Sequence, residues 1–503
     1  MPVQFNPQTQ PVKSQASVSP MRLYLPFLAA FALVCICAAG TYFDAGPWQI
    51  WVGIAILSVV LIAFVSIPAA IAVLIVFSPY NSLIRQVAGD SILIRGLRDL
   101  MSYVILAVFF VKFSGKSRTR AHSTVAWLFI FWCVVVQLIQ FIHSGSPLIG
   151  ILGLRALVGF FLFFPVLVAV LSLSENGVAD AEGLLGTIVF TAGVVAVIQL
   201  ANHFNLIHIP IEFSDEQETL IRNLGGNDFT RMNPIWEVSP SGLAIYLISA
   251  TMIIIARFAE TGKVPILWLP CLAGNLACAF LTLSHATIVS FLLGLGVISI
   301  CIRRKVLGGV VLMAVTLAAM PILFGNNSFS EKNTAEYSVS FFKIWAASWA
   351  SALSHPIFGT GAAPSGYLAE LAQGEAHSIG DGGWAMFASQ VGIPFTIVML
   401  WWSLSILVKS GHTLIGDNSA DGSKRWVLLG ALSGAAVYFA NAHGVPWYRV
   451  GADVNFIVLV AILTVFAVRD TPAFRKTGRF RRNRRDLAGA NSLVPNIHVN
   501  KPD

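Results

Sequence analysis

Long apolar runs recur along almost the whole chain and constrain its fold more than any other feature. Residues 240–256, for example, contain no charged side chain, and only 11% of all 503 residues are charged. A run of about 18 or more apolar residues can cross a lipid bilayer as a helix, and so little charge cannot cover the surface of a soluble domain. The sequence therefore predicts an all-α, polytopic integral membrane protein.

The apolar runs predict about 12–14 transmembrane helices, separated by short polar segments and two long loops. The second and third spans are short enough to form one kinked element, so their number stays open. The predicted spans are 22–41, 48–63, 67–80, 97–113, 124–143, 155–173, 183–201, 240–257, 264–282, 285–302, 306–324, 383–408, 426–444 and 452–469. The first eleven fill residues 22–324, and the last three fill 383–469.

Lysine and arginine predict the orientation of these spans. If the N-terminus is cytoplasmic and the spans alternate, all but nine of the 32 Lys and Arg fall on the cytoplasmic side, as the positive-inside rule requires. The polar segment 1–21 is then a disordered cytoplasmic tail, and the basic segment 470–503 is a second one. The long loop 325–382 lies on the opposite, periplasmic side. The basic tail is expected to anchor the topology at anionic lipid, so no nucleic-acid partner is predicted.

Several arginines fall on the outer side, against this rule. Four of them end apolar helices there: Arg98, Arg155, Arg231 and Arg449. Any one of them can be explained by snorkelling or by pairing with a carboxylate such as Asp99 or Asp453. Because arginine keeps its charge and binds phosphate through two hydrogen bonds, the set together predicts an outer-leaflet site for a phosphorylated lipid.

The loop 325–382 carries the residues that suggest chemistry. An amphipathic segment ends at His355-Pro356, and a glycine-rich stretch with His377 and Asp381 follows. A neutral histidine or a carboxylate can accept the proton of a sugar hydroxyl, whereas the alternative is a solvated histidine and an aspartate that caps the next helix. The chain has no nucleotide-binding or metal-binding motif, so we predict no cofactor and no metal.

The motifs of this region resemble those of the bacterial O-antigen ligase and O-antigen/exopolysaccharide polymerase superfamily. In that family a basic residue and a tryptophan precede a turn of the form hPlfGxG, and here Lys343 and Trp345 precede "HPIFGTG" at 355–361. Asp381 lies eleven residues before Gly392 of "VGIPF", the place of the family's His-Asn or Asp-Asn step.

Two upstream elements resemble the family more loosely. The stretch "RNLGGNDFTRMNP" contains Arg222 and Arg231, and "LTLSHATIVS" has His285 where the family more often has arginine. The resemblance covers roughly residues 80–400.

The resemblance implies an inverting glycosyltransferase in the bacterial inner membrane that needs neither metal nor nucleotide. Its substrates would be glycans on undecaprenyl pyrophosphate, and its partners membrane lipid and a chain-length regulator or other polysaccharide assembly protein. The base would be His377 or Asp381. The leaving pyrophosphate would be stabilised by Arg155, Arg231 and Arg449, with Arg98 and Arg222 in support.

Three aromatic residues, Trp384, Trp447 and Tyr448, are candidates to line a sugar groove, with anchoring at the membrane interface as the alternative. The aspartate-led step favours a polysaccharide polymerase over an O-antigen ligase that transfers the glycan to lipid A core. A lipid-linked oligosaccharide flippase remains the alternative from another class of protein, although the chain shows no internal repeat.

Overall fold

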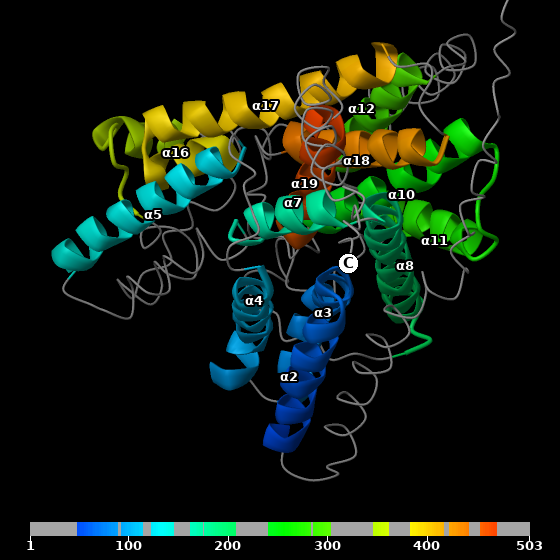
Figure 1. Cartoon of the computed structure of the whole chain (residues 1–503), viewed down its shortest axis with the longest axis horizontal. Coiled ribbons are helices and arrows are strands. Elements are labelled where there is room, and N and C mark those ends of the chain that lie inside the picture. The colour runs from blue at the N-terminus through cyan, green and yellow to red at the C-terminus, as the bar shows by residue number, and fades with distance from the viewer. Residues whose placement is uncertain are drawn as a thin grey trace, which may run out of the picture.

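Helices form all of the regular secondary structure in the part of the chain that the structure, a computed structural model, describes (Figure 1). That part comprises residues 48–88, 92–113, 122–144, 161–174, 176–207, 240–282, 285–302, 346–361, 383–416, 422–441 and 453–469. The predicted all-α fold is confirmed for these residues.

The observed helices follow the predicted spans closely. In chain order they are α2 (Trp48–Val65), α3 (Ile67–Ala88), α4 (Ile92–Phe113), α5 (His122–Ser144), α7 (Phe163–Leu173), α8 (Gly177–His203), α10 (Pro240–Thr261), α11 (Trp268–Leu281), α12 (His285–Cys301), α16 (Gly383–Val391), α17 (Ile393–Gly416), α18 (Gly422–Asn441) and α19 (Asp453–Arg469). A further helix covers 346–354. The predicted spans 22–41 and 306–324 lie outside the described residues.

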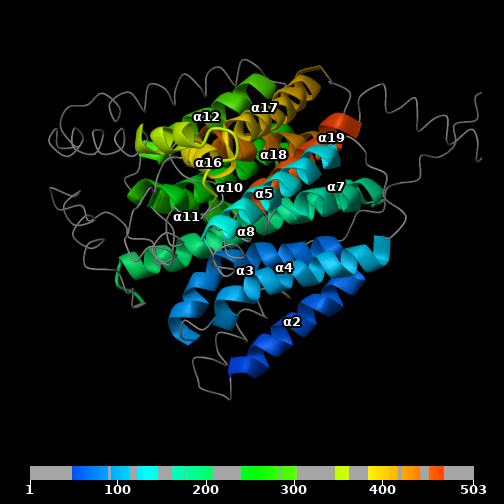
Figure 2. The ribbon, with the colours of Figure 1, turned by 90° about the vertical axis from the view of Figure 1, so that its left-hand side faces the viewer.

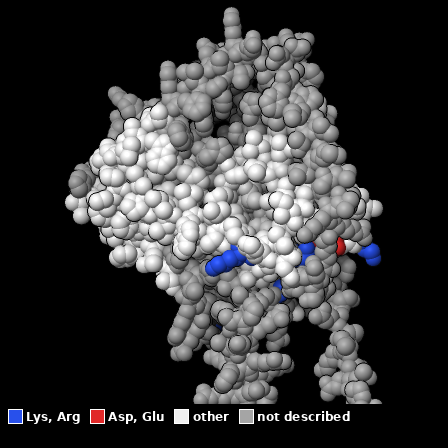
Figure 3. All heavy atoms as spheres, turned by 90° about the horizontal axis from the view of Figure 1, so that it is seen from above, with Lys and Arg blue, Asp and Glu red and all other residues white. Residues whose placement is uncertain are grey.

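Within the part of the chain that the structure describes, three helices, α8, α10 and α17, are both long and apolar enough to cross a membrane. On α17, Ile397, Trp401, Leu404 and Val408 lie three or four residues apart and are exposed, Trp401 to 73%. An exposed apolar stripe of this kind fits a lipid environment better than water. The described surface in Figure 3 is almost entirely uncharged, with Lys and Arg, and Asp or Glu, at a few places only. These helices indicate a membrane protein, whereas the full number of spans stays a prediction.

The centre of the structure is α10, which packs against α8, α11, α12 and α18. Glycines let α18 come close to it: a Cβ added at Gly434 would lie 2.9 Å from Ser249 Oγ of α10. The Ser249 hydroxyl in turn donates a hydrogen bond to the Gly434 carbonyl oxygen at 3.3 Å. Small residues at the interface are a common basis of helix packing in membranes, where lipid competes for apolar surface.

The helices α2, α3 and α4 pack against one another at the lower edge of Figures 1 and 2. The single residue Ser66 separates α2 from α3, so the second and third predicted spans are two helices rather than one. The ammonium group of Lys112 donates hydrogen bonds to the carbonyl oxygens of Ala63, at 3.3 Å, and of Phe64. Lys112 of α4 thereby caps the C-terminal end of α2.

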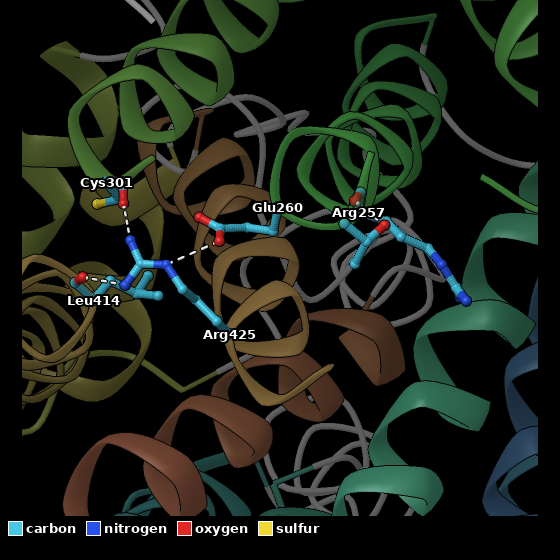
Figure 4. Close-up of polar contacts among 6 residues, drawn as sticks. Arg257, Glu260, Cys301, Leu414 and Arg425 are labelled. Atoms are coloured by element: carbon cyan, nitrogen blue, oxygen red, sulfur yellow. Dashed lines mark hydrogen bonds and ion pairs between the residues drawn. The ribbon is translucent and has the colours of Figure 1, made fainter. Parts of the chain in front are cut away.

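Arg425 joins four helix ends. Its Nε–H donates to Glu260 Oε2 of α10 at 2.9 Å, Nη1 to the Leu414 carbonyl of α17 at 2.5 Å, and Nη2 to the Cys301 carbonyl of α12 at 2.6 Å (Figure 4). The side chains of Arg425 and Glu260 are each only 2% exposed. The charge pattern predicts all four ends on one side of the membrane, and the structure brings them together; which side this is remains a prediction.

The helix α18 begins four residues earlier than the predicted span 426–444. It starts at Gly422, so Arg425 lies within the helix. The reason is that the first turn of α18 packs against the C-terminal ends of other helices. The last carbonyl oxygens of those helices have no partner within their own helix and need a hydrogen-bond donor such as Arg425.

A second polar cluster lies near the first. The Arg257 guanidinium of α10 lies over the rings of Trp268 and Trp426, 4.9 and 4.7 Å from their centroids. Trp426 Nε1–H donates to Glu182 Oε1 of α8 at 3.0 Å, and the Ser423 hydroxyl donates to the same oxygen. Ion pairing, cation–π contacts and hydrogen bonds therefore hold α8, α10, α11 and α18 together at this end of the bundle.

Candidate functional site

The predicted span 383–408 is not one helix, and its break is the centre of the candidate site. The structure divides it into α16 and α17 at Gly392, whose φ of +92° is outside the helical range. The correction has a physical cause, because the turn "HPIFGTG" at 355–361 packs against the break. Residues 355–361 and "VGIPF", the two motifs on which the family resemblance chiefly depends, are thus in contact.

Backbone hydrogen bonds join this turn, residues 355–361, to the end of α16. The Thr360 N–H donates to the Ser389 carbonyl oxygen at 2.7 Å, and the Gly361 N–H donates to the Gln390 carbonyl oxygen at 3.0 Å. The Thr360 hydroxyl also donates to the Ser389 carbonyl, at 3.1 Å. Carbonyl groups that a continuous helix would use internally are therefore satisfied by the turn.

The start of α17 is bound to the same turn. The Ile393 N–H, which a continuous helix would direct at Ser389, donates instead to the Pro356 carbonyl oxygen at 2.8 Å. A Cβ added at Gly392 would lie 2.0 Å from the Ile357 carbonyl oxygen, and one added at Gly359 would lie 2.5 Å from the Gln390 carbonyl group. Gly359 also has a positive φ, +68°. Only glycine meets both requirements at these two positions.

Helix α5 completes the contact from the other side, since it packs against α16 and α17 (Figures 1 and 2). Trp132 Nε1–H donates to the Val391 carbonyl oxygen at 2.6 Å. Its ring stacks on Phe358 of the turn, with centroids 5.2 Å apart, and on Phe395 of α17, with centroids 5.8 Å apart. Trp132 thus touches the turn and both halves of the broken helix.

Trp384 is the only sugar-groove candidate with a described side chain. It lies in the first turn of α16, is half-buried, and contacts the rings of Phe387 and Phe439 at centroid distances of 6.0 Å each. Trp384 therefore lies on the helix whose other end receives the turn. Its contact with a sugar stays a prediction.

Most of the other predicted site residues fall outside the described ranges. These are His377, Asp381, Arg155, Arg222, Arg231, Arg449, Trp447 and Tyr448. Arg98 lies within α4, and its side chain is likewise outside the description. The arrangement of the predicted base and arginines is consequently untested. Among the described residues, no group of three His, Cys, Asp or Glu side chains is placed to hold a metal ion.

The contribution of α5 to the candidate site was not predicted from the sequence. Trp132, Gln137 and Gln140 lie in an apolar run, and the two glutamines three residues apart were the one available signal. Gln137 is 3% exposed, and Gln140 Oε1 lies where a Cβ of Gly361 would be, 1.6 Å away. The face of α5 that meets the turn 355–361 is therefore polar as well as aromatic.

No protein-family model matches the chain, and no curated protein matches it significantly.

Proposed function

We propose that the protein is a bacterial membrane glycosyltransferase that polymerises polysaccharide repeats carried on undecaprenyl pyrophosphate, at the periplasmic face of the inner membrane. The observation that supports this most is the contact between the turn 355–361 and the break at Gly392. These are the motifs that resemble the O-antigen ligase and polymerase superfamily, and they come from places more than 30 residues apart.

The contact matters because of what lies between its two parts in the chain. Gly361 donates its N–H to Gln390 of α16, and Gly383 begins the same helix. The segment 362–382, which contains His377 and Asp381, therefore starts and ends at α16. Fixed ends reduce the conformational entropy lost when a loop orders around a substrate, which suits residues that have to act on one.

The proposed reaction is a direct displacement. A hydroxyl oxygen of the acceptor glycan attacks the anomeric carbon of the donor and forms the new glycosidic bond, while the bond from that carbon to the pyrophosphate oxygen breaks. The hydroxyl proton passes to His377 or Asp381, and the bonding electrons leave with undecaprenyl pyrophosphate. Arg155, Arg231 and Arg449, supported by Arg98 and Arg222, stabilise the charge that the leaving group gains. The anomeric configuration is inverted.

Transport of a lipid-linked oligosaccharide is the second candidate, and the broken helix favours it. Discontinuous helices often form the substrate sites of transporters, with ionisable residues near the middle of the membrane. Here the described buried ion pair, Glu260 and Arg425, instead lies at helix ends and binds helix-terminal carbonyls. This ion pair thus holds helix ends together, which favours the enzyme.

A deletion strain separates these possibilities. For a polymerase, we expect long polysaccharide to disappear while single repeat units persist at the cell surface or on lipid carrier, measured by gel profiles of lipopolysaccharide and secreted polysaccharide. Loss of glycan transfer to lipid A core, with long polymer still present on the carrier, would instead identify a ligase.

Purified wild-type protein in lipid nanodiscs should lengthen undecaprenyl-pyrophosphate-linked repeats and release undecaprenyl pyrophosphate, whereas a transporter would release none.

The proposed site residues can be tested in the same nanodisc assay. Arg155→Ala is expected to lower the rate of undecaprenyl pyrophosphate release about 100-fold, because one group that stabilises developing charge is lost. Of His377→Ala and Asp381→Asn, the one that removes the base should lower the rate by a similar factor, about 100-fold or more. Lys409→Met, at an exposed position on α17, serves as the control. Full activity in both base variants would remove the loop 325–382 from the chemistry.

A further inference from the structure

Two glutamines of α5 next to the turn 355–361 are buried without hydrogen-bond partners. Gln137 is 3% exposed, and neither its Nε2 nor its Oε1 has a partner among the described residues. Gln140, one turn further along, has a buried Oε1 that also lacks one in this part of the chain. The two residues lie on the same face of the helix because they are three positions apart.

One of these amides, Gln140, lies directly at the proposed site. Gln140 is against Gly361, the last residue of the turn for which the structure gives a position. Gln137 lies one turn before Gln140 on the same face of α5, three positions away. The two glutamines therefore form one polar strip of α5 that reaches the turn 355–361 at Gln140.

An unpaired amide is costly at such a place. Burial of a polar group without a partner costs about 1–3 kcal/mol, and a leucine or methionine would fill the same space without that cost. Another buried amide in the structure is satisfied: Asn441 Nδ2 donates to Ser290 Oγ at 2.6 Å and to the Val437 carbonyl at 2.8 Å. Unpaired amides beside a candidate site are expected of groups that form their hydrogen bonds with a bound ligand.

We propose that Gln137 and Gln140 form a subsite for an uncharged, hydroxyl-bearing sugar ring of the lipid-linked glycan. An amide both donates and accepts hydrogen bonds and carries no charge, so it suits sugar hydroxyls, whereas the pyrophosphate requires arginine. This inference rests on the proposed function, since it assigns a part of the same substrate to a part of the same site.

The test compares Gln137→Met with a matched variant. Asn275 of α11 is also fully buried, and neither its Nδ2 nor its Oδ1 has a described partner, but α11 packs against α8 and α10, away from the turn 355–361. Asn275→Leu thus removes an equally unpaired amide from a place outside the site. Both variants should unfold at the wild-type temperature or above it, because each loses an unsatisfied buried group.

Binding is measured in nanodiscs with two probes: the lipid-linked oligosaccharide fraction extracted from membranes of the deletion strain, and undecaprenyl pyrophosphate alone. We expect wild type and Asn275→Leu to bind the extracted fraction more tightly than the carrier alone. Gln137→Met should bind the extracted fraction about 5- to 10-fold more weakly than wild type and the carrier equally well, as the loss of one or two neutral hydrogen bonds predicts.

Two other outcomes of these measurements would contradict the proposal. Wild-type affinity in Gln137→Met, or a lower unfolding temperature of that variant, would show that the glutamine is not a free sugar-binding group, and the proposed function would stand. Equal affinity of the wild type for both probes would instead count against glycan recognition as a whole, and the subsite and the proposed function would fall together.

Discussion

Replacing Arg425 by methionine is expected to destabilise the protein by about 3–5 kcal/mol, because it leaves a buried carboxylate without its partner. Glu260 is 2% exposed, and its other oxygen, Oε1, already has no partner among the described residues. The carbonyl oxygens of Cys301 and Leu414 lose their donor at the same time. The measurement is the apparent midpoint of thermal unfolding, compared within one series of variants in nanodiscs.

The control is the double variant Arg425→Met/Glu260→Met. Buried ion pairs can often be replaced by apolar residues at little cost, so the double variant should recover most of the lost stability. Lys409→Met, which removes an exposed positive charge from α17, should leave the midpoint unchanged. An Arg425→Met protein that unfolds with wild type, or a double variant no more stable than the single one, would show that the pair does not hold these helix ends.

Most of the described fold was predictable from the apolar runs alone. The predicted spans 48–63, 285–302 and 452–469 each agree with an observed helix to within two residues. Membrane-spanning helices can be recognised from the sequence because nearly all of their residues are apolar, whatever they pack against. The helix 346–354 likewise ends before His355-Pro356, as the proline predicts.

The break at Gly392 was not predicted, because its cause lies elsewhere in the chain. The run 383–408 contains no charged residue, and the donors that replace the missing helical bonds come from Thr360, Gly361 and Trp132. The sequence "GIP" did carry a local signal, since glycine ends helices and proline is favoured in a first turn. A hydrophobicity pattern does not detect such a signal. The position of the turn 355–361 against the break depends on tertiary structure.

The candidate site was predictable only in part for the same reason. Family resemblance selected "HPIFGTG" and "VGIPF", and the structure shows the two in contact. It could not select Gln137 or Trp132, which belong to a helix that the motifs do not include. Whether a glutamine in an apolar run is satisfied depends on what faces it, and only the packing of α5 against the turn 355–361 shows this.

The two ends of α17 are held in different ways. At one end, Arg425 fixes Leu414 through a buried, charged hydrogen bond. At the other, the break depends on backbone bonds to a turn and on the Trp132 stack. A charged hydrogen bond is about twice as strong as a neutral one, but five neutral hydrogen bonds meet at the break, so both ends of α17 are firmly held.

Replacing Gly392 by alanine is expected to abolish long polymer and to destabilise the protein by about 2–6 kcal/mol, as the sum of backbone strain and overpacking. The strain arises because Gly392 has a φ of +92°, which L-residues rarely adopt. The overpacking arises because the new Cβ would lie 2.0 Å from the Ile357 carbonyl oxygen, so the turn 355–361 has to move away from the break. Polymer length on gels and the midpoint of thermal unfolding measure the two effects.

Gly411→Ala, in the same helix α17, is the matched control. Nothing lies within 4 Å of a Cβ added at Gly411, so alanine there meets no neighbour. Alanine in a helix interior is more favourable than glycine by about 0.5–1 kcal/mol, so this variant should be slightly more stable than wild type and fully active. If Gly392→Ala instead behaves like Gly411→Ala in both measurements, the contact between the turn and the break is needed neither for the fold nor for polymer formation, and the support that this contact lends to the proposed enzyme disappears.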